Sequence, residues 1–252
     1  MKLTFLGTGT STGVPQIGCK CKVCTSGDSR DQRLRCSAIV ETESTRVLLD
    51  CGPDFRQQIL NIPFKKLDAV LLTHVHYDHV GGLDDLRPFC IFGDVDVFAN
   101  LDTAKGLIHS MPYCFAEKKY PGVPQINLHV IKPHQVFKLG DISVTPIEVI
   151  HGKLPILGYR LDDLVYITDM KEISESEYAY LKNVKILVVN ALRWEMHPTH
   201  QSIYQAIEFA ERVHAESTYF IHMSHHAGLY AETDLKIPQS IHLSYDGLSL
   251  SF

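Results

Sequence analysis

The sequence lacks any apolar run long enough to cross a membrane, and its first residues lack the pattern of a signal peptide. A membrane-spanning helix needs about 20 mostly apolar residues, and the apolar part of a signal peptide runs for about 7 to 15. Residues 1–13 instead hold a four-residue apolar run followed by glycines and threonines. We therefore expect a cytoplasmic protein with no membrane partner.

Basic charge is also scarce, because 24 Lys and Arg residues face 29 Asp and Glu residues, which gives a net charge of −5. A chain with this balance has no global basic field to hold a long nucleic acid. Low-complexity segments, internal repeats and linkers are absent too, while 45% of the 252 residues are hydrophobic. This composition predicts a single folded domain over residues 1–252.

Short apolar runs of strand length, bounded by turn residues, dominate the chain. They predict strands at residues 3–6, 37–41, 46–50, 69–73, 95–99, 136–139, 142–147, 157–161, 164–168, 186–190, 219–222 and 248–252. Gly140-Asp141 and Asp162-Asp163 are typical of tight hairpin turns. Helical periodicity is clearest at 102–111, 174–183 and 199–213. Because helices stand singly between groups of strands, the pattern favours an α+β fold of two packed sheets with helices outside.

Histidine and cysteine, in contrast, are abundant, with 14 and 7 residues that are unevenly distributed. The strongest signal is the segment THVHYDH at 73–79, which directly follows the apolar run 69–72. His74 and His76 project the same way from an extended chain, whereas the adjacent Asp78 and His79 must point elsewhere. This H-x-H-x-D-H pattern indicates metal binding at two positions rather than one. The two glycines at 81–82 let the chain turn tightly after it.

Three more ligand-type residues follow strand-like runs elsewhere in the chain: His151, Asp169 and His222. Strand ends are where open sheets commonly present functional side chains. Each of these residues alone would be an ordinary loop or hydrogen-bonded residue. Together with the H-x-H-x-D-H segment, they indicate further metal ligands.

Cys19, Cys21 and Cys24 form a C-x-C-x-x-C cluster whose flanking lysines favour thiolates. Three thiolates and one further ligand make a closed tetrahedral zinc site. The alternative is three reduced surface thiols without a metal. The other four cysteines stand among apolar neighbours, which suits reduced thiols in a core.

The fourth ligand of such a zinc site is not fixed by the spacing. In H-x-x-H at 222–225, the first histidine serves the larger site while His225 reaches outward. Cys36 and His226 compete with His225 for this role.

The THVHYDH segment and its glycines, the LLDCG at 48–52 and the three downstream residues resemble the metallo-β-lactamase superfamily over nearly the whole chain. The resemblance implies a four-layer αββα sandwich of two mixed β-sheets flanked by helices. It also implies, by position, His74, His76 and His151 as ligands of one ion, Asp78, His79 and His222 as ligands of the other, and Asp169 as the bridge. Asp50 would orient the metal loop from behind the ligands.

The C-x-C-x-x-C loop, the opening LTFLGTGTSTGVPQIGC and the H-x-x-H together resemble the PhnP branch, whose members act as cyclic ribosyl phosphate phosphodiesterases. The resemblance implies a structural zinc held by Cys19, Cys21, Cys24 and His225 in a loop at about 15–35. Coenzyme biosynthesis proteins with related N-termini share the same features.

Charge in the expected dinuclear site favours an anionic substrate. Two divalent ions contribute +4, Asp78 and Asp169 contribute −2 and a bridging hydroxide contributes −1, which leaves about +1 among neutral histidines. Such a site attracts a monoanion such as a phosphodiester, and the metal-bridging hydroxide would be the nucleophile. Imidazole and carboxylate ligands accept Mn, Zn or Fe. Oxygen-reducing di-iron relatives carry glutamate where this chain has His76, which argues against a redox centre.

A high-pKa leaving group needs a proton, and histidine is the usual donor. The resemblance to the phosphodiesterase branch points to His200 as the general acid, with a helix-capping contact as the structural alternative. Asp78 is expected to contribute to catalysis as well as to metal binding. For His197 a structural role is favoured.

The leading hypothesis is a metal-dependent phosphodiesterase that hydrolyses a small or cyclic phosphodiester. A transfer-RNA 3'-end nuclease has the same ligands, but it normally carries a basic, glycine-rich arm, and no such run lies between His79 and His151. A low-turnover, metal-loaded carrier protein of coenzyme biosynthesis is the alternative from another class. A homodimer is expected only because dimers are the commonest soluble oligomers.

Overall fold

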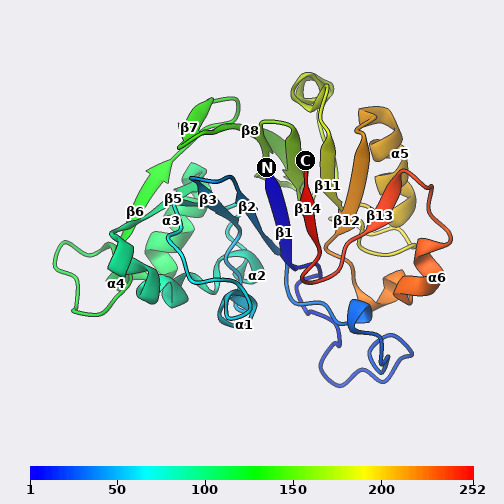
Figure 1. The fold of residues 1–252 in the computed structure, drawn as a ribbon, viewed down its shortest axis with the longest axis horizontal. Helices are drawn as coiled ribbons and strands as arrows, with labels where there is room; N and C mark the ends of the chain where they lie inside the picture. The colour runs from blue at the N-terminus through cyan, green and yellow to red at the C-terminus, as the bar shows by residue number, and fades with distance from the viewer.

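Two seven-stranded β-sheets form the centre of the computed structural model, which describes residues 1–252 (Figure 1). The first sheet has the order β14-β1-β2-β3-β4-β5-β6 and consists of β1 (Lys2–Gly7), β2 (Ser37–Glu41), β3 (Arg46–Leu49), β4 (Ala69–Leu71), β5 (Val95–Ala99), β6 (Ile126–Val130) and β14 (Ser249–Ser251). The second has the order β13-β12-β11-β10-β9-β8-β7 and consists of β7 (Phe137–Leu139), β8 (Ile142–His151), β9 (Leu154–Leu161), β10 (Leu164–Ile167), β11 (Ile186–Asn190), β12 (Ser217–Ile221) and β13 (Ile241–Leu243).

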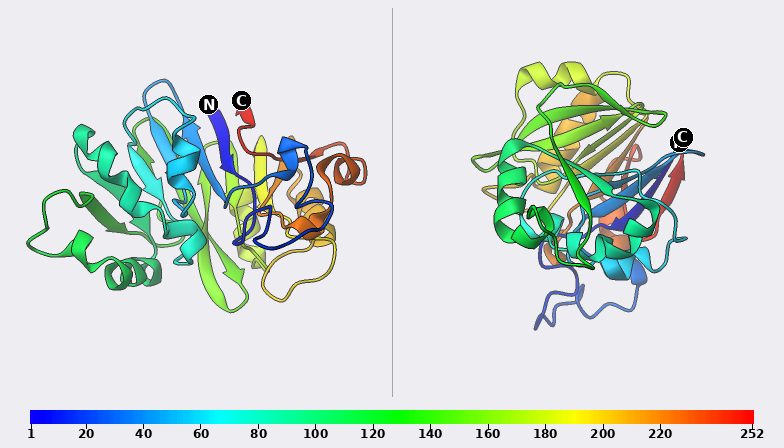
Figure 2. Two further views of the ribbon diagram at one scale, coloured as in Figure 1. Left: turned by 90° about the horizontal axis from the view of Figure 1, so that it is seen from below. Right: turned by 90° about the vertical axis from the view of Figure 1, so that its left-hand side faces the viewer.

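Helices cover the outer face of each sheet (Figures 1 and 2). The first sheet carries α1 (Phe55–Ile59), α2 (Tyr77–Val80), the 3₁₀-helix η2 (Leu83–Phe92), α3 (Leu101–Ser110) and α4 (Pro112–Phe115). The second carries η3 (Glu175–Leu181), α5 (Ile203–Val213) and α6 (Tyr230–Asp234), and the short turns η1 (Ser29–Asp31) and η4 (His225–Ala227) complete the set. None of these helices combines the length and the apolar character needed to cross a bilayer.

Three apolar cores hold the four layers together. The central one lies between the sheets and includes Phe5 from the first sheet and Tyr159 from the second, both fully buried. A second core joins the second sheet to Phe209 of α5, and a third joins the first sheet to Phe55 of α1 and Leu86 of η2. The α+β fold of two mixed sheets flanked by helices is therefore confirmed.

Both predicted hairpin turns are present. Gly140-Asp141 joins β7 to β8 with Leu139 opposite Ile142, and Asp162-Asp163 joins β9 to β10 with Leu161 opposite Leu164. The first residue of each turn has a positive φ, 55° and 49° respectively. Glycine adopts this conformation freely and aspartate tolerates it, which is why these pairs mark such turns.

Several elements differ from the prediction. β6 was missed because it is mostly exposed and mixes Asn127 and His129 with apolar residues, so no apolar run marks it. β13 is only three residues long and α1 only five. The predicted helix 199–213 begins at Ile203, because Ser202 caps it and Gln205 returns the hydrogen bond in a capping box. The predicted helix 174–183 is a 3₁₀-helix.

Parallel strand pairs bring the ends of several strands to one edge. β3 and β4 are parallel neighbours in the first sheet, and β10, β11 and β12 are parallel neighbours in the second. Residues that directly follow these strands therefore gather at the same edge of the sandwich. Asp50, the 73–79 segment, Asp169 and His222 all follow such strands.

The glycine pair after the histidine segment lies in the predicted turn, between α2 and η2, and also permits close packing. Gly81 and Gly82 have ordinary φ values of −65° and −97°. A Cβ on Gly82 would lie 2.1 Å from the carbonyl oxygen of Gly52, and one on Gly81 would lie 2.7 Å from the carbonyl oxygen of Tyr77. The predicted turn is therefore present, without any backbone conformation that only glycine adopts, and contact with Gly52 is what excludes a side chain at Gly82.

We expect Gly82→Ala to lower the free energy of unfolding by about 1–3 kcal/mol, because the new methyl group must displace backbone. Urea denaturation measures the change. Gly27→Ala is the matched control, since nothing lies within 4 Å of a Cβ at that position, and its effect should stay within about 0.5 kcal/mol. Equal effects of the two substitutions would contradict the packing argument.

Candidate functional site

Three imidazoles converge where the loop after β4 meets the end of β8. The Nε2 atom of His74 lies 2.9 Å from the Nδ1 atom of His76. His151, the last residue of β8, completes a group whose ligand atoms all lie within 4.8 Å of one another. Since β4 and β8 belong to different sheets, this group joins the two halves of the sandwich.

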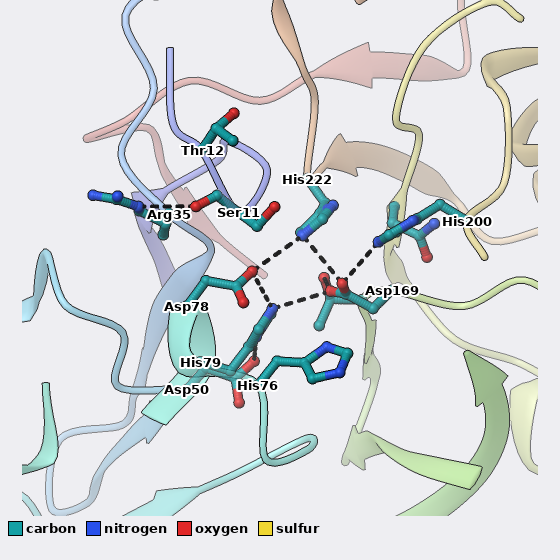
Figure 3. A network of polar contacts seen from close by, with 12 residues as sticks. Ser11, Thr12, Arg35, Asp50, His76, Asp78, His79, Asp169, His200 and His222 are labelled. Carbon is teal, nitrogen blue, oxygen red and sulfur yellow. Dashed lines mark hydrogen bonds and ion pairs between the residues drawn. The ribbon is translucent and has the colours of Figure 1, made fainter. Parts of the chain in front are cut away.

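A second group, Asp78, His79, Asp169 and His222, lies beside the first (Figure 3). The Nε2 atom of His79 is 3.2 Å from an oxygen of Asp78 and 3.2 Å from an oxygen of Asp169. The Nε2 atom of His222 is 3.1 Å from Asp169 and 3.7 Å from Asp78. The fold thus brings together all seven side chains predicted for the dinuclear site, while their role as ligands stays a prediction.

The donor atoms of this cluster fit metal ions. The Nε2 atom of His79 and both ring nitrogens of His222 are buried and make no hydrogen bond, although the carboxylates of Asp78 and Asp169 lie at ion-pair distance from the two Nε2 atoms. A buried polar atom without a partner costs about 1–3 kcal/mol. Imidazole nitrogens next to the carboxylates of Asp78 and Asp169 are a donor set that divalent transition metals accept.

Ionisation in the cluster follows burial and neighbouring charge. Burial lowers the pKa of His74 well below its usual value, so its ring is neutral. Burial alone would also lower the pKa of His79, but the carboxylates of Asp169 and Asp50 outweigh it and raise the pKa well above normal. Burial would raise the pKa of Asp169, but His222 and His79 hold it well below the usual range. The carboxylate of Asp169 is therefore charged.

Asp50 and Thr73 orient two of these rings from below. Nδ1 of His79 lies 2.7 Å from Oδ2 of Asp50, which leaves Nε2 facing Asp78 and Asp169. Asp50 also accepts the backbone N–H of Thr73 at 2.8 Å, and the Thr73 hydroxyl lies 3.0 Å from Nδ1 of His74. Asp50 thus lies where the resemblance implied. Thr73 was not predicted to have a role, and its place directly before His74 was its one sequence signal.

Three residues of the site have left-handed backbone: Asp50, Asp169 and His222, with φ of 56°, 58° and 56°. Non-glycine residues in this region cost about 1–3 kcal/mol each and cluster at functional sites. Each of them comes just after a strand, so the left-handed bend turns its side chain toward the shared edge. This strain was not visible in the sequence.

Asn190, the last residue of β11, fixes the Asp169 loop. Its Oδ1 accepts the backbone N–H of Met170 at 2.8 Å, and its Nδ2 donates to the Met170 carbonyl at 3.0 Å. Asn190 is fully buried. These two bonds support the strained backbone of Asp169. In the sequence, the only sign of this role was a polar residue at the end of an apolar run.

His200 reaches the site from the segment before α5. Its Nε2 atom lies 3.0 Å from Oδ1 of Asp169, and its ring stacks on that of His222 with the centroids 4.9 Å apart. It makes no capping contact, because Ser202 caps the helix. Burial lowers the pKa of His200 to about 4, although the hydrogen bond to Asp169 opposes this shift. His200 therefore contacts the cluster through Asp169 and His222, with 13% of its side chain exposed.

The cysteine cluster forms a separate group on the N-terminal loop. The ligand atoms of Cys19, Cys21, Cys24 and His225 lie within 4.8 Å of one another. Nδ1 of His225 is 3.4 Å from Sγ of Cys19 and 3.3 Å from Sγ of Cys21. The backbone N–H of Cys24 and the ring of His225 lower the pKa of Cys21 to about 6, whereas burial raises the pKa of Cys24 to about 11.

The two competitors for the fourth position lie elsewhere. Cys36 is buried in the core between the sheets, and His226 is exposed with its ring tilted by 44° against that of His225. The geometry therefore favours His225, and zinc binding by this group stays a prediction.

Comparison with known proteins places this geometry in a family. A model described as a beta-lactamase superfamily domain matches residues 45–223. An octanoyltransferase of Porphyromonas gingivalis is 44% identical over 250 residues, which are 98% of this chain and 51% of that protein. Coenzyme PQQ synthesis protein B of Methylorubrum extorquens is 36% identical over 118 residues, which are 40% of either protein. The chain thus spans about half the length of these relatives or less, and the activities in their names belong to the whole proteins.

Two solved structures are similar over the full chain. A new diphosphatase from the PhnP family has 40% sequence identity and a TM-score of 0.92, with 100% of this chain and 97% of that one covered. Zinc-bound PqqB from Methylobacterium extorquens has 21% identity and a TM-score of 0.82, with 100% of both chains covered, a likeness of fold alone. The chain therefore belongs to the metallo-β-lactamase superfamily and is similar to a diphosphatase of the PhnP family.

Proposed function

We propose that this protein is a dinuclear metal phosphodiesterase that hydrolyses a small or cyclic phosphodiester of the cyclic ribosyl phosphate type. The observation that carries the proposal is the buried cluster around Asp169, in which nitrogens of two histidines make no hydrogen bond and His200 contacts the same carboxylate. The likeness to a PhnP-family diphosphatase supports phosphoryl chemistry.

Two divalent ions, Mn, Zn or Fe, would be held by the seven side chains described above, with Asp169 between them. When bound, such ions supply a strong nucleophile from water at neutral pH and neutralise charge on the phosphoryl group. Two of the predicted ligands are oriented without a metal, because Asp50 accepts a hydrogen bond from Nδ1 of His79 and the Thr199 carbonyl accepts one from Nδ1 of His151 at 2.9 Å.

Charge selects an anion as the substrate. The two carboxylates of the site, Asp78 and Asp169, only partly offset two divalent ions, and the imidazoles that ligate them are neutral. The net positive charge of such a pocket attracts a phosphodiester monoanion and holds its non-bridging oxygens. The acidic net charge of the whole chain, −5, disfavours a long polyanion such as transfer RNA.

His200 would protonate the leaving oxygen from Nε2. This nitrogen faces the cluster at 3.0 Å from Asp169, so a diester bound there lies within its reach. The bound anion favours the protonated ring, because an opposite charge at close range raises the pKa of histidine. Protonation matters most for an alkoxide and little for a stable phenolate.

We expect the metal-loaded protein to hydrolyse bis(p-nitrophenyl) phosphate. We expect a higher kcat/KM for a cyclic ribosyl phosphate. A panel with Mn, Zn or Fe should also include 2',3'-cyclic nucleotides, precursor transfer RNA and a glutathione thioester. Product formation is followed by absorbance or chromatography. Absence of diester turnover with every metal would refute the proposal, and cleavage of the transfer RNA alone would favour the nuclease.

His200→Ala should lower kcat for an alkyl leaving group by about 100-fold or more, since general acids contribute about 10²–10⁴-fold. Hydrolysis of a p-nitrophenyl diester should fall far less, and metal content should be unchanged. His109→Ala, a substitution on the exposed face of α3, is the matched control. Equal losses with both leaving groups would exclude a role as acid.

Cys21→Ser should remove about one zinc per chain and leave the dinuclear metals in place, because the two groups share no residue. Plasma emission analysis of the purified variant measures this. Cys90→Ser, a free cysteine outside either group, should keep every metal. Loss of all metals from Cys21→Ser would contradict independent sites.

A further inference from the structure

Thr199 contacts both His151, a predicted metal ligand, and His200, the predicted general acid. It belongs to the segment between β11 and α5, directly before His200. Neither its position in the sequence nor the resemblance assigned it a role. Its backbone contacts His151 and its side chain contacts His200, so the two contacts can be tested separately.

The backbone of Thr199 holds a predicted metal ligand. Its carbonyl oxygen accepts the Nδ1–H of His151 at 2.9 Å, so the Nε2 atom of His151 is free to face the cluster. The methyl group also packs against the turn after β8, since a Cβ on Gly152 would lie 2.9 Å from Cγ2 of Thr199. Gly152 itself has a φ of 64°, where glycine is favoured. The contacts with His151 and Gly152 therefore fix the position of Thr199 without its hydroxyl.

The side chain of Thr199 contacts His200. Its Oγ1 atom lies 2.9 Å from Nδ1 of His200, while Nε2 of the same ring lies 3.0 Å from Oδ1 of Asp169. A carboxylate can only accept, so Nε2 must carry the proton. In the neutral ring Nδ1 is then an acceptor, and the Thr199 hydroxyl is its donor. Nδ1 of His197 accepts the backbone N–H of Thr199 at 3.4 Å and lies 3.2 Å from both the hydroxyl oxygen of Thr199 and Nδ1 of His200.

We propose that Thr199 is a positioning residue whose hydroxyl orients the His200 ring and keeps its proton on Nε2, the atom that faces the reaction centre. The consequence for catalysis rests on the proposed function, in which His200 protonates the leaving group. A hydroxyl suits this position because it donates to the neutral ring and accepts from the protonated one. Valine has the same shape and can do neither.

The first test reads the ring directly and needs no substrate. In zinc-loaded protein labelled with ¹⁵N-histidine, the His200 signals are assigned by their loss in His200→Gln. Wild type and Thr199→Ser should show a protonated Nε2 and an acceptor Nδ1, whereas Thr199→Val should show a mixture of tautomers. A protonated Nδ1 in the neutral wild-type ring, or an unchanged tautomer in Thr199→Val, would overturn the proposal.

The second test separates positioning from metal binding. Thr199→Val keeps the backbone carbonyl, so metal content and KM should stay within about twofold, while kcat for an alkyl leaving group falls by about tenfold or more. A p-nitrophenyl diester should be affected far less, and Thr199→Ser should restore most of the loss. Thr218→Val is the matched control, because it makes the same change at a buried position at the start of β12, at the end of the strand away from His222. It should alter neither kcat nor the metal content.

Two outcomes of the second test would contradict a positioning role: equal losses with both leaving groups, or loss of metal from Thr199→Val. Failure of the proposed function looks different. If wild type hydrolyses no diester at all, the phosphodiesterase assignment fails, while the tautomer measurement still decides whether Thr199 sets the proton on His200.

Discussion

The carboxylate of Asp169 is the interaction on which the rest of the site depends. It is buried and charged, and its oxygens lie 3.0 to 3.2 Å from nitrogens of His79, His200 and His222. A buried charge is tolerated only with partners, and these partners come from distant parts of the chain. The carboxylate therefore ties α2, the end of β12 and the segment before α5 to one point between the sheets.

Holding this point costs backbone strain, which the surroundings offset. Asp50, Asp169 and His222 all bend into the left-handed region just beyond their strands. Buried hydrogen bonds from Thr73 to Asp50 and in both directions between Asn190 and the Met170 backbone fix two of these bends. Bound metal ions would supply the remaining stabilisation by ligating the nitrogens of His79 and His222 that make no hydrogen bond.

The cysteine group connects the N-terminal loop to the segment that carries His222. His225 follows His222 by three residues, so one short segment contributes to both groups. The backbone of Met223, between them, accepts the N–H of Thr10 and donates to the carbonyl of Thr8. Ordering of the cysteine loop by zinc would therefore steady the chain beside the dinuclear cluster.

The sequence by itself determined the features that local pattern encodes. Short apolar runs marked most strands, and H-x-H-x-D-H and C-x-C-x-x-C marked both groups, because the side chains of each motif lie within a few residues of one another. Tertiary structure alone decided which ring nitrogen faces the cluster, that Asn190 and Thr199 support it, and that β6 forms an edge strand. Those facts depend on contacts between residues far apart in the chain, and a threonine or asparagine carries no local sign of the partner it will meet.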